Sequence, residues 1–227
     1  MRLLVRLLGL VVVLAVIVVV LAAFAGVAKV PVLTGFFGND KPRDLGEAAP
    51  DQAGFDALVA GYGIKMPSPA QNYTFASPHS FSGSVKVDAT FTEGQIMALK
   101  EMGNPAPGIS DVHMRFHAGS AEVAAMVDLS AWGYPASGPV WATWTLDVTG
   151  PTSVEVAITQ LEFGKIPVPG DLATQASDAL NNYLASRLPQ VDGLEIGTFE
   201  LVEGGVHFSG SLPQTYEASA PVPGGLP

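Results

Sequence analysis

A long unbroken apolar run opens the chain. Residues 7–28 are all apolar or glycine, with Arg2 and Arg6 before the run and Lys29 after it. A helix rises about 1.5 Å per residue, so about 20 such residues cross the core of a bilayer. The pattern predicts an N-terminal transmembrane anchor at residues 1–29, with residues 3–28 in the membrane.

The same run also fits a cleaved secretory signal, because it has a basic start and an Ala-x-Ala site at residues 23–25. The run is longer than the centre of a usual signal, which favours a retained anchor. The numbers of Lys and Arg on its two sides do not decide the orientation. A basic start followed directly by the run favours the N-terminus inside. Both interpretations give a single-pass or secreted chain whose domain lies on the extracytoplasmic side of the cell membrane.

Helix and strand patterns begin after a neck at residues 30–50, which Gly and Pro interrupt. Asp51 is a typical N-cap, and it predicts a short helix that ends at Tyr62. Residues 66–82 are rich in Pro and Ser and predict an extended loop.

Next comes a strand with a helix directly attached. Residues 85–91 alternate between apolar and polar, as expected of a half-buried strand. Thr92 and Gln95 then stand at the spacing of a capping box, which predicts that a second helix begins here.

Four further alternating segments predict an antiparallel meander. They cover about residues 111–117, 122–129, 141–148 and 154–163. In the last segment the apolar residues change parity after Gln160. Such a change predicts a bulge, or a strand that passes from one packing partner to another.

A long helix and a hairpin complete the pattern. Residues 171–188 carry one apolar stripe, and Pro189 ends the helix. Residues 194–212 form two alternating strands around Gly204 and Gly205. The tail at residues 213–227 is rich in Pro and Gly and is expected to be disordered.

This order predicts an α+β fold: an N-terminal transmembrane helix, then a curved antiparallel sheet packed on one long amphipathic helix. The extracytoplasmic domain is expected at residues 51–212, a length sufficient for one domain with its own core.

Charge and cysteine content narrow the function. The 227-residue chain has 11 basic and 21 acidic residues, for a net charge of −10, and three of the basic residues belong to the anchor. Phosphates repel so acidic a domain, so nucleic acid is excluded as a partner. There is no cysteine, which excludes disulfides, thiol catalysis and thiolate metal sites.

No motif predicts catalysis, a cofactor or a metal site. His113 and His117 would share one face of a strand but stand about 13 Å apart, too far for one ion. His79 and His207 have no flanking ligand pattern. Carboxylates such as Glu122 and Glu162 occupy outward strand positions, which a solvated sheet face explains. We therefore expect a protein that is not an enzyme.

Some outward positions of the sheet are apolar as well. They are Ala124, Met126, Trp141 and Ala157. An antiparallel sheet normally keeps one face polar. Either the first two helices or the neck cover these positions, or the curved sheet and the long helix leave an apolar groove between them for a lipid chain.

Three stretches resemble the membrane-anchored bacterial envelope proteins of the YpmS and LmeA kind, and more distantly the tubular lipid-binding (TULIP-like) folds. They are residues 81–96, with a Thr-Glu helix start after a strand, residues 163–169, with Gly-Lys-Ile-Pro-Val-Pro before the long helix, and the hairpin at residues 193–210. With the anchor, the resemblance covers most of the chain, and it includes no catalytic residue.

The resemblance implies a sheet wrapped around a long helix, with an apolar groove that holds lipid or another lipophile. The inward strand positions and the helix stripe are then the expected groove residues: Val112, Met114, Phe116, Val123, Val127, Trp144, Leu146, Val156, Ile158, Leu180 and Leu184. The expected function is lipid binding by a membrane-anchored extracytoplasmic domain. The alternative is a structural or interaction module of the envelope without a small ligand, with a packed interior and an exposed apolar patch near Trp132 and Tyr134.

Overall fold

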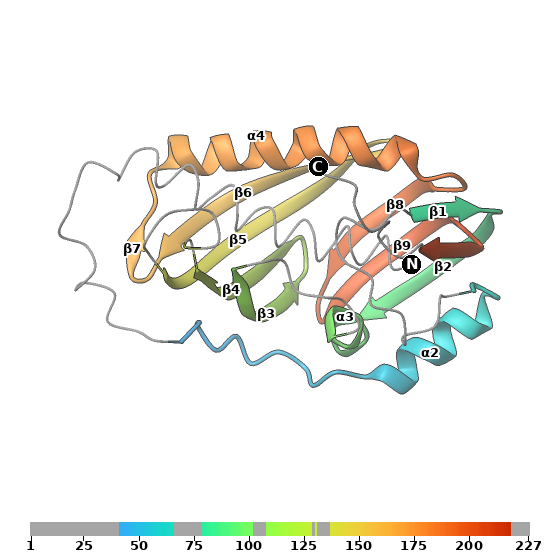
Figure 1. Cartoon of the computed structure of the whole chain (residues 1–227), viewed down its shortest axis with the longest axis horizontal. Coiled ribbons are helices and arrows are strands. Elements are labelled where there is room, and N and C mark those ends of the chain that lie inside the picture. Colours follow the sequence, from blue (N-terminus) through green and yellow to red (C-terminus); the bar gives the residue numbers. More distant parts are fainter. Residues whose placement is uncertain (1–40, 66–78, 102–107, 129, 131–136, 219–227) are drawn as a thin grey trace, which may run out of the picture.

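The computed structural model describes residues 41–65, 79–101, 108–128, 130 and 137–218 (Figure 1). The predicted anchor, most of the neck and the region of Trp132 and Tyr134 lie outside the described residues. Within the described part of the chain, no helix is both long and apolar enough to cross a membrane.

A five-stranded antiparallel meander forms the larger sheet. Its strands follow chain order: β3 (Ile109–His117), β4 (Ser120–Asp128), β5 (Ser137–Gly150), β6 (Ser153–Phe163) and β7 (Ile166–Pro167). The predicted meander is confirmed, and β7 is a short addition to it. The predicted bulge is confirmed as well, because the β5–β6 register shifts between Thr143, opposite Gln160, and Trp144, opposite Ile158.

The remaining strands form two smaller antiparallel sheets. One has the order β2 (Val85–Thr92), β9 (Gly205–Leu212), β8 (Glu195–Val202), and the other pairs β1 (His79–Ser82) with β10 (Thr215–Ala218). Three sequence predictions are corrected here. The described strands form three separate antiparallel sheets instead of the one curved sheet expected. The loop expected at residues 66–82 ends in a strand, and the tail expected to be disordered from residue 213 begins with β10. The Pro, Ser and Gly residues around each strand indicate a loop, and each strand forms because it pairs with the other.

Local capping explains where two of the helices begin. The carboxylate of Asp51 accepts a bond from Gly54 N at 2.8 Å and opens α2 (Gln52–Gly61). Thr92 N donates to Gln95 Oε1 at 3.0 Å while Gln95 N donates to Thr92 Oγ1 at 3.3 Å, the predicted capping box of α3 (Glu93–Glu101).

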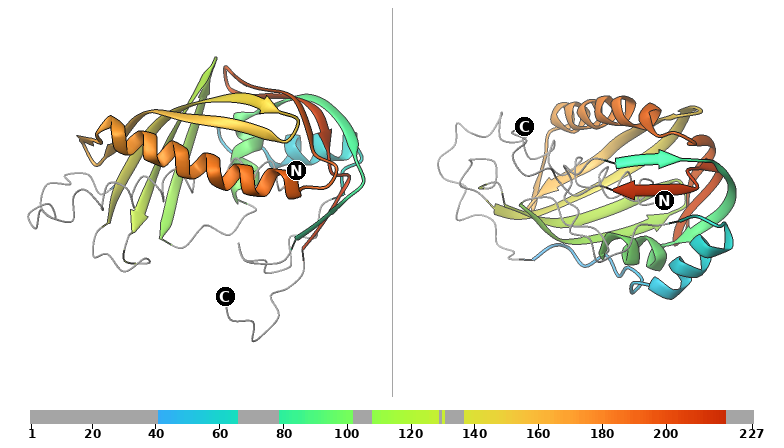
Figure 2. Two further views of the ribbon diagram at one scale, coloured as in Figure 1. Left: turned by 90° about the horizontal axis from the view of Figure 1, so that it is seen from above. Right: turned by 45° about the vertical axis from the view of Figure 1, so that its right-hand side comes forward.

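The long helix α4 (Gly170–Arg187) runs along the five-stranded sheet and packs on β6 (Figures 1 and 2). A short 3-10 turn, η3 (Leu188–Gln190), follows it. β2, β8 and β9 lie together at the end of the molecule opposite β7 (Figure 1). Inward side chains of the two larger sheets and of α4 form one buried apolar core.

Side chains of α4 also close the free edge of β6. Asn181 accepts from Val156 N at 2.8 Å through Oδ1 and donates from Nδ2 to Val156 O at 3.0 Å. Ser177 Oγ accepts from Ile158 N at 2.9 Å. Exposed strand edges invite pairing with other chains, so these contacts protect the sheet as well as fix the helix.

Candidate functional site

The predicted groove residues lie together in the core. Nine of the eleven are buried, and five of these, Phe116, Val123, Val127, Leu180 and Leu184, have an exposed fraction of 0%. Val112 and Leu146 are partly buried against the same cluster. The structure thus brings the residues together, and their role as ligand contacts stays a prediction.

A cleft of about 430 Å³ opens from the surface beside this core, between the second half of β5 and β8. Its lining residues are Gly119, Leu146, Asp147, Val148, Gly197, Thr198, Phe199, Glu200 and Leu201. Leu146 is the predicted groove residue that reaches it. The cleft volume falls within the range of about 300–1,000 Å³ typical of small-molecule sites.

The cleft exists because two strands approach each other without pairing. β5 and β8 belong to different sheets. β8 is tied at one end by Ile196 N, which donates to Pro151 O at 2.6 Å, and at the other by Leu201 O, which accepts from Gly119 N at 2.8 Å. The residues of β8 that line the cleft belong to the segment between these two bonds. β8 is therefore fixed at both ends of the cleft and is not paired with β5 between them.

Two buried side-chain atoms among the described residues, Thr143 Oγ1 and Trp144 Nε1, have no hydrogen-bond partner. Trp144 is 2% exposed, and its indole Nε1 makes no hydrogen bond. An unsatisfied buried donor costs about 1–3 kcal/mol and calls for an explanation such as a bound water or ligand. Trp144 lies two positions from Leu146 on the same face of β5, but it is not among the residues that line the cleft.

A segment that we call the strap, residues 41–50, crosses the outer face of the five-stranded sheet, where Trp141 lies. Arg43 Nη2 donates to Glu162 Oε2 of β6 at 2.8 Å, and its guanidinium carbon lies 3.9 Å from the ring centre of Trp141. The strap therefore covers Trp141, which is 9% exposed. Of the two explanations for apolar outward positions, coverage by the neck is confirmed at this residue.

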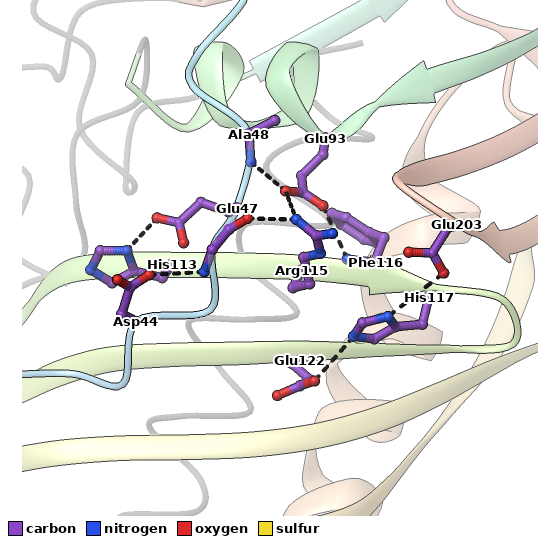
Figure 3. A network of polar contacts seen from close by, with 11 residues as sticks. Asp44, Glu47, Ala48, Glu93, His113, Arg115, Phe116, His117, Glu122 and Glu203 are labelled. Atoms are coloured by element: carbon purple, nitrogen blue, oxygen red, sulfur yellow. Dashed lines mark hydrogen bonds and ion pairs between the residues drawn. The ribbon is translucent and has the colours of Figure 1, made fainter.

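The middle of the strap is held by a buried carboxylate, Glu93, in the first turn of α3 (Figure 3). Glu93 is 2% exposed. Its Oε1 accepts from Ala48 N and lies 3.6 Å from Arg115 Nη1, while Oε2 accepts from Phe116 N at 3.3 Å. Arg115 Nη1 donates in turn to Gly46 O. One carboxylate thus joins the strap, α3 and β3.

The two histidines of β3 contact different carboxylates (Figure 3). His113 contacts Glu47 of the strap through Nδ1 and Asp111 through Nε2. His117 contacts Glu122 at 3.0 Å and Glu203 at 3.7 Å. No group of three or more His, Asp or Glu in the described residues could hold a metal ion.

The surroundings of His113 change its pKa. Partial burial of the ring lowers the pKa, but the hydrogen bond and charge of Glu47, with the charge of Asp111, outweigh burial and raise the pKa above 6.5. The ring is therefore disposed to carry the positive charge that holds Glu47, and with it the strap, on β3.

Sequence reasoning missed three of these groups. The sequence indicates Glu93 only as part of a Thr-Glu helix start, and no motif distinguishes Asn181 or Glu47. The available signal was weak. A polar residue on the inner side of an amphipathic helix, as at Asn181, marks a polar partner in the core, but the partner itself is distant in sequence.

Comparisons of this chain with protein-family models, with curated proteins and with solved structures gave no significant match. The functional interpretation therefore depends on the geometry described above.

Proposed function

We propose that this chain is a membrane-anchored extracytoplasmic protein that binds a lipid or another lipophile in the cleft between β5 and β8. The observation that supports this most directly is the cleft itself, about 430 Å³, whose mixed lining includes apolar residues from two separate sheets. The ligand enters between β5 and β8, rather than between the sheet and α4.

The chemistry of the cleft suits an amphiphile. Leu146, Val148, Phe199 and Leu201 supply apolar walls, while Asp147 and Glu200 are exposed at the rim. An alkyl chain against these walls is stabilised by about 0.8 kcal/mol for each buried methylene.

The apolar run at residues 7–28 supplies the membrane location in this proposal. A domain tethered to a bilayer meets lipids at high local concentration. The resemblance to tubular lipid-binding folds points in the same direction.

A second candidate function rests on the walls of the cleft being strand edges. An extended peptide could add between β5 and β8 through main-chain hydrogen bonds, as in strand-addition complexes. The chain would then be an interaction module of the envelope, with no small ligand.

The test is native mass spectrometry of the full chain released from detergent micelles, followed by organic extraction of bound molecules. We expect a stoichiometric lipophile. Thr198→Trp, which places a bulky ring in the cleft, should abolish this binding.

Ala157→Trp is the matched control, because Ala157 is exposed on the outer face of β6. Both variants keep the anchor, so lipid around the anchor remains in both spectra and only cleft-bound ligand differs. Equal ligand in the two variants contradicts the lipophile site. A ligand-free parent chain that captures an extended peptide, with capture lost in Thr198→Trp, supports the second candidate.

A further inference from the structure

An apolar turn protrudes at the end of the molecule where β6 leads into α4. Ile166 is 41% exposed, and it is the one large apolar side chain that is exposed among the described residues. Lys165, Pro167 and Pro169 around it are exposed too, and Val168 is half-buried. We call residues 165–169 the tip.

The strap begins beside this tip. Arg43 is bonded to Glu162, and Glu162 lies opposite Pro167 in the β6–β7 ladder. Neighbouring strands are about 5 Å apart, so Arg43 is anchored within about one strand spacing of the tip. Figures 1 and 2 show the beginning of the strap and β7 at the same end of the molecule.

The expected anchor therefore reaches the domain at this end. At most 12 residues, 29–40, separate the apolar run from Lys41. A fully extended segment of that length spans about 40 Å. Because Arg43 fixes the segment to β6, the tip is the part of the domain held nearest the bilayer.

Charge favours the same contact. The domain is strongly acidic, whereas at this end Lys41, Arg43 and Lys165 balance Asp44, Glu162 and Asp171. Lys41 and Lys165 are exposed, and the described residues include no ion-pair partner for either. A basic side chain near an anionic membrane surface contributes about 1 kcal/mol.

We propose that the tip is a membrane-contact surface: Ile166 enters the headgroup region of an anionic bilayer, with Lys41 and Lys165 against the lipid phosphates. The tip and the tether together orient the domain, with β5 running away from the bilayer and the cleft on its distal half. This inference rests on the anchor of the proposed function, and it is independent of whether the cleft binds a lipophile.

The test uses the absence of cysteine in the natural chain. The full chain with Pro167→Cys is labelled with a polarity-sensitive fluorophore and reconstituted into vesicles of phosphatidylcholine and phosphatidylglycerol. We expect headgroup-region nitroxide lipids to quench this label several-fold more strongly than a label on Glu155→Cys, which is exposed far along β6. Adding Ile166→Ser to the Pro167→Cys chain should remove most of the difference.

The outcomes separate the anchor from the tip. A chain that does not float with the vesicles overturns the anchor, and this proposal with it. A floating chain whose two labels are quenched equally overturns the tip contact alone. Strong quenching at the tip that persists with Ile166→Ser shows proximity through the tether and also overturns the contact. Lipid extraction from the cleft is a separate measurement and is unaffected by either result.

Discussion

Two open edges of the five-stranded sheet, that of β3 and the part of β6 that the short β7 does not cover, are closed by side chains of opposite character. At the β6 edge the groups are neutral: the Asn181 amide bonds both backbone groups of Val156, and the Ser177 hydroxyl bonds Ile158 N. At the β3 edge they are charged: Glu93 accepts from Phe116 N, and Lys100 Nζ donates to Val112 O at 2.7 Å. Both devices prevent pairing with another chain.

The difference shows how the edges are connected to the rest of the molecule. The β6 closure involves α4 and β6 alone, so it is a local cap. At the β3 edge, Glu93 also holds Ala48 of the strap and Arg115. Loss of that carboxylate is therefore expected to disturb three segments, whereas loss of Asn181 disturbs two.

The largest effect is expected for Glu93→Gln. The amide keeps the shape of the side chain, but its NH₂ group must face an N–H donor that a carboxylate oxygen accepted. We expect a loss of about 3 kcal/mol in the free energy of unfolding, because a buried donor is left without an acceptor and Arg115 loses its charge partner. Urea unfolding followed by tryptophan fluorescence measures this loss.

The control is Glu155→Gln, at an exposed outward position of β6, which should change stability by less than about 0.5 kcal/mol. Equal losses for the two variants would show that Glu93 is not a junction between the strap, α3 and β3.

A smaller effect is expected at the neutral edge. Asn181→Leu removes two hydrogen bonds and leaves the N–H and C=O of Val156 against an apolar side chain. The free energy of unfolding should fall by about 2 kcal/mol, with more self-association because part of the β6 edge is free. Urea unfolding and light scattering measure the two effects.

The neighbouring Asn182 is exposed and supplies the matched control. Asn182→Leu makes the same change of side chain on the same helix. If it destabilises the domain as much as Asn181→Leu, helix propensity rather than edge closure explains the loss, and the comparison of the two edges fails.

Much of the fold could be predicted from the sequence, because its elements are specified locally. The N-cap at Asp51, the capping box at Thr92, the meander and the bulge near Gln160 each depend on residues a few positions apart. The extent of α4 follows from its apolar stripe and from Pro189.

The site residues depend on long-range contacts, which one sequence does not reveal. Glu93 meets Phe116 and Ala48, which are 23 and 45 positions away. Asn181 meets Val156 across 25 positions. The pairing of β1 with β10 and the division into separate sheets likewise join distant segments. Inward and outward positions could be predicted, but not the gap between β5 and β8.

The smallest effect is expected from pH, at the charged edge alone. Glu47 and Asp111, the carboxylates that face His113, raise its pKa above 6.5, so the stability from the charged ring is fully present below about pH 6.5 and is lost as pH rises through the folded-state value. A double-mutant cycle of His113→Gln and Glu47→Gln, measured by urea unfolding, should give a coupling free energy of at most about 1 kcal/mol between the two side chains. The coupling should be present at about pH 5.5 and absent at about pH 8.5, once the ring has lost its proton.

The same cycle with Asn181 and Ser177 has no charged member and should not depend on pH. A pH-independent coupling between His113 and Glu47 would show that the strap is held by a neutral hydrogen bond, and the chemical contrast between the two edges would then be confined to Glu93 and Lys100.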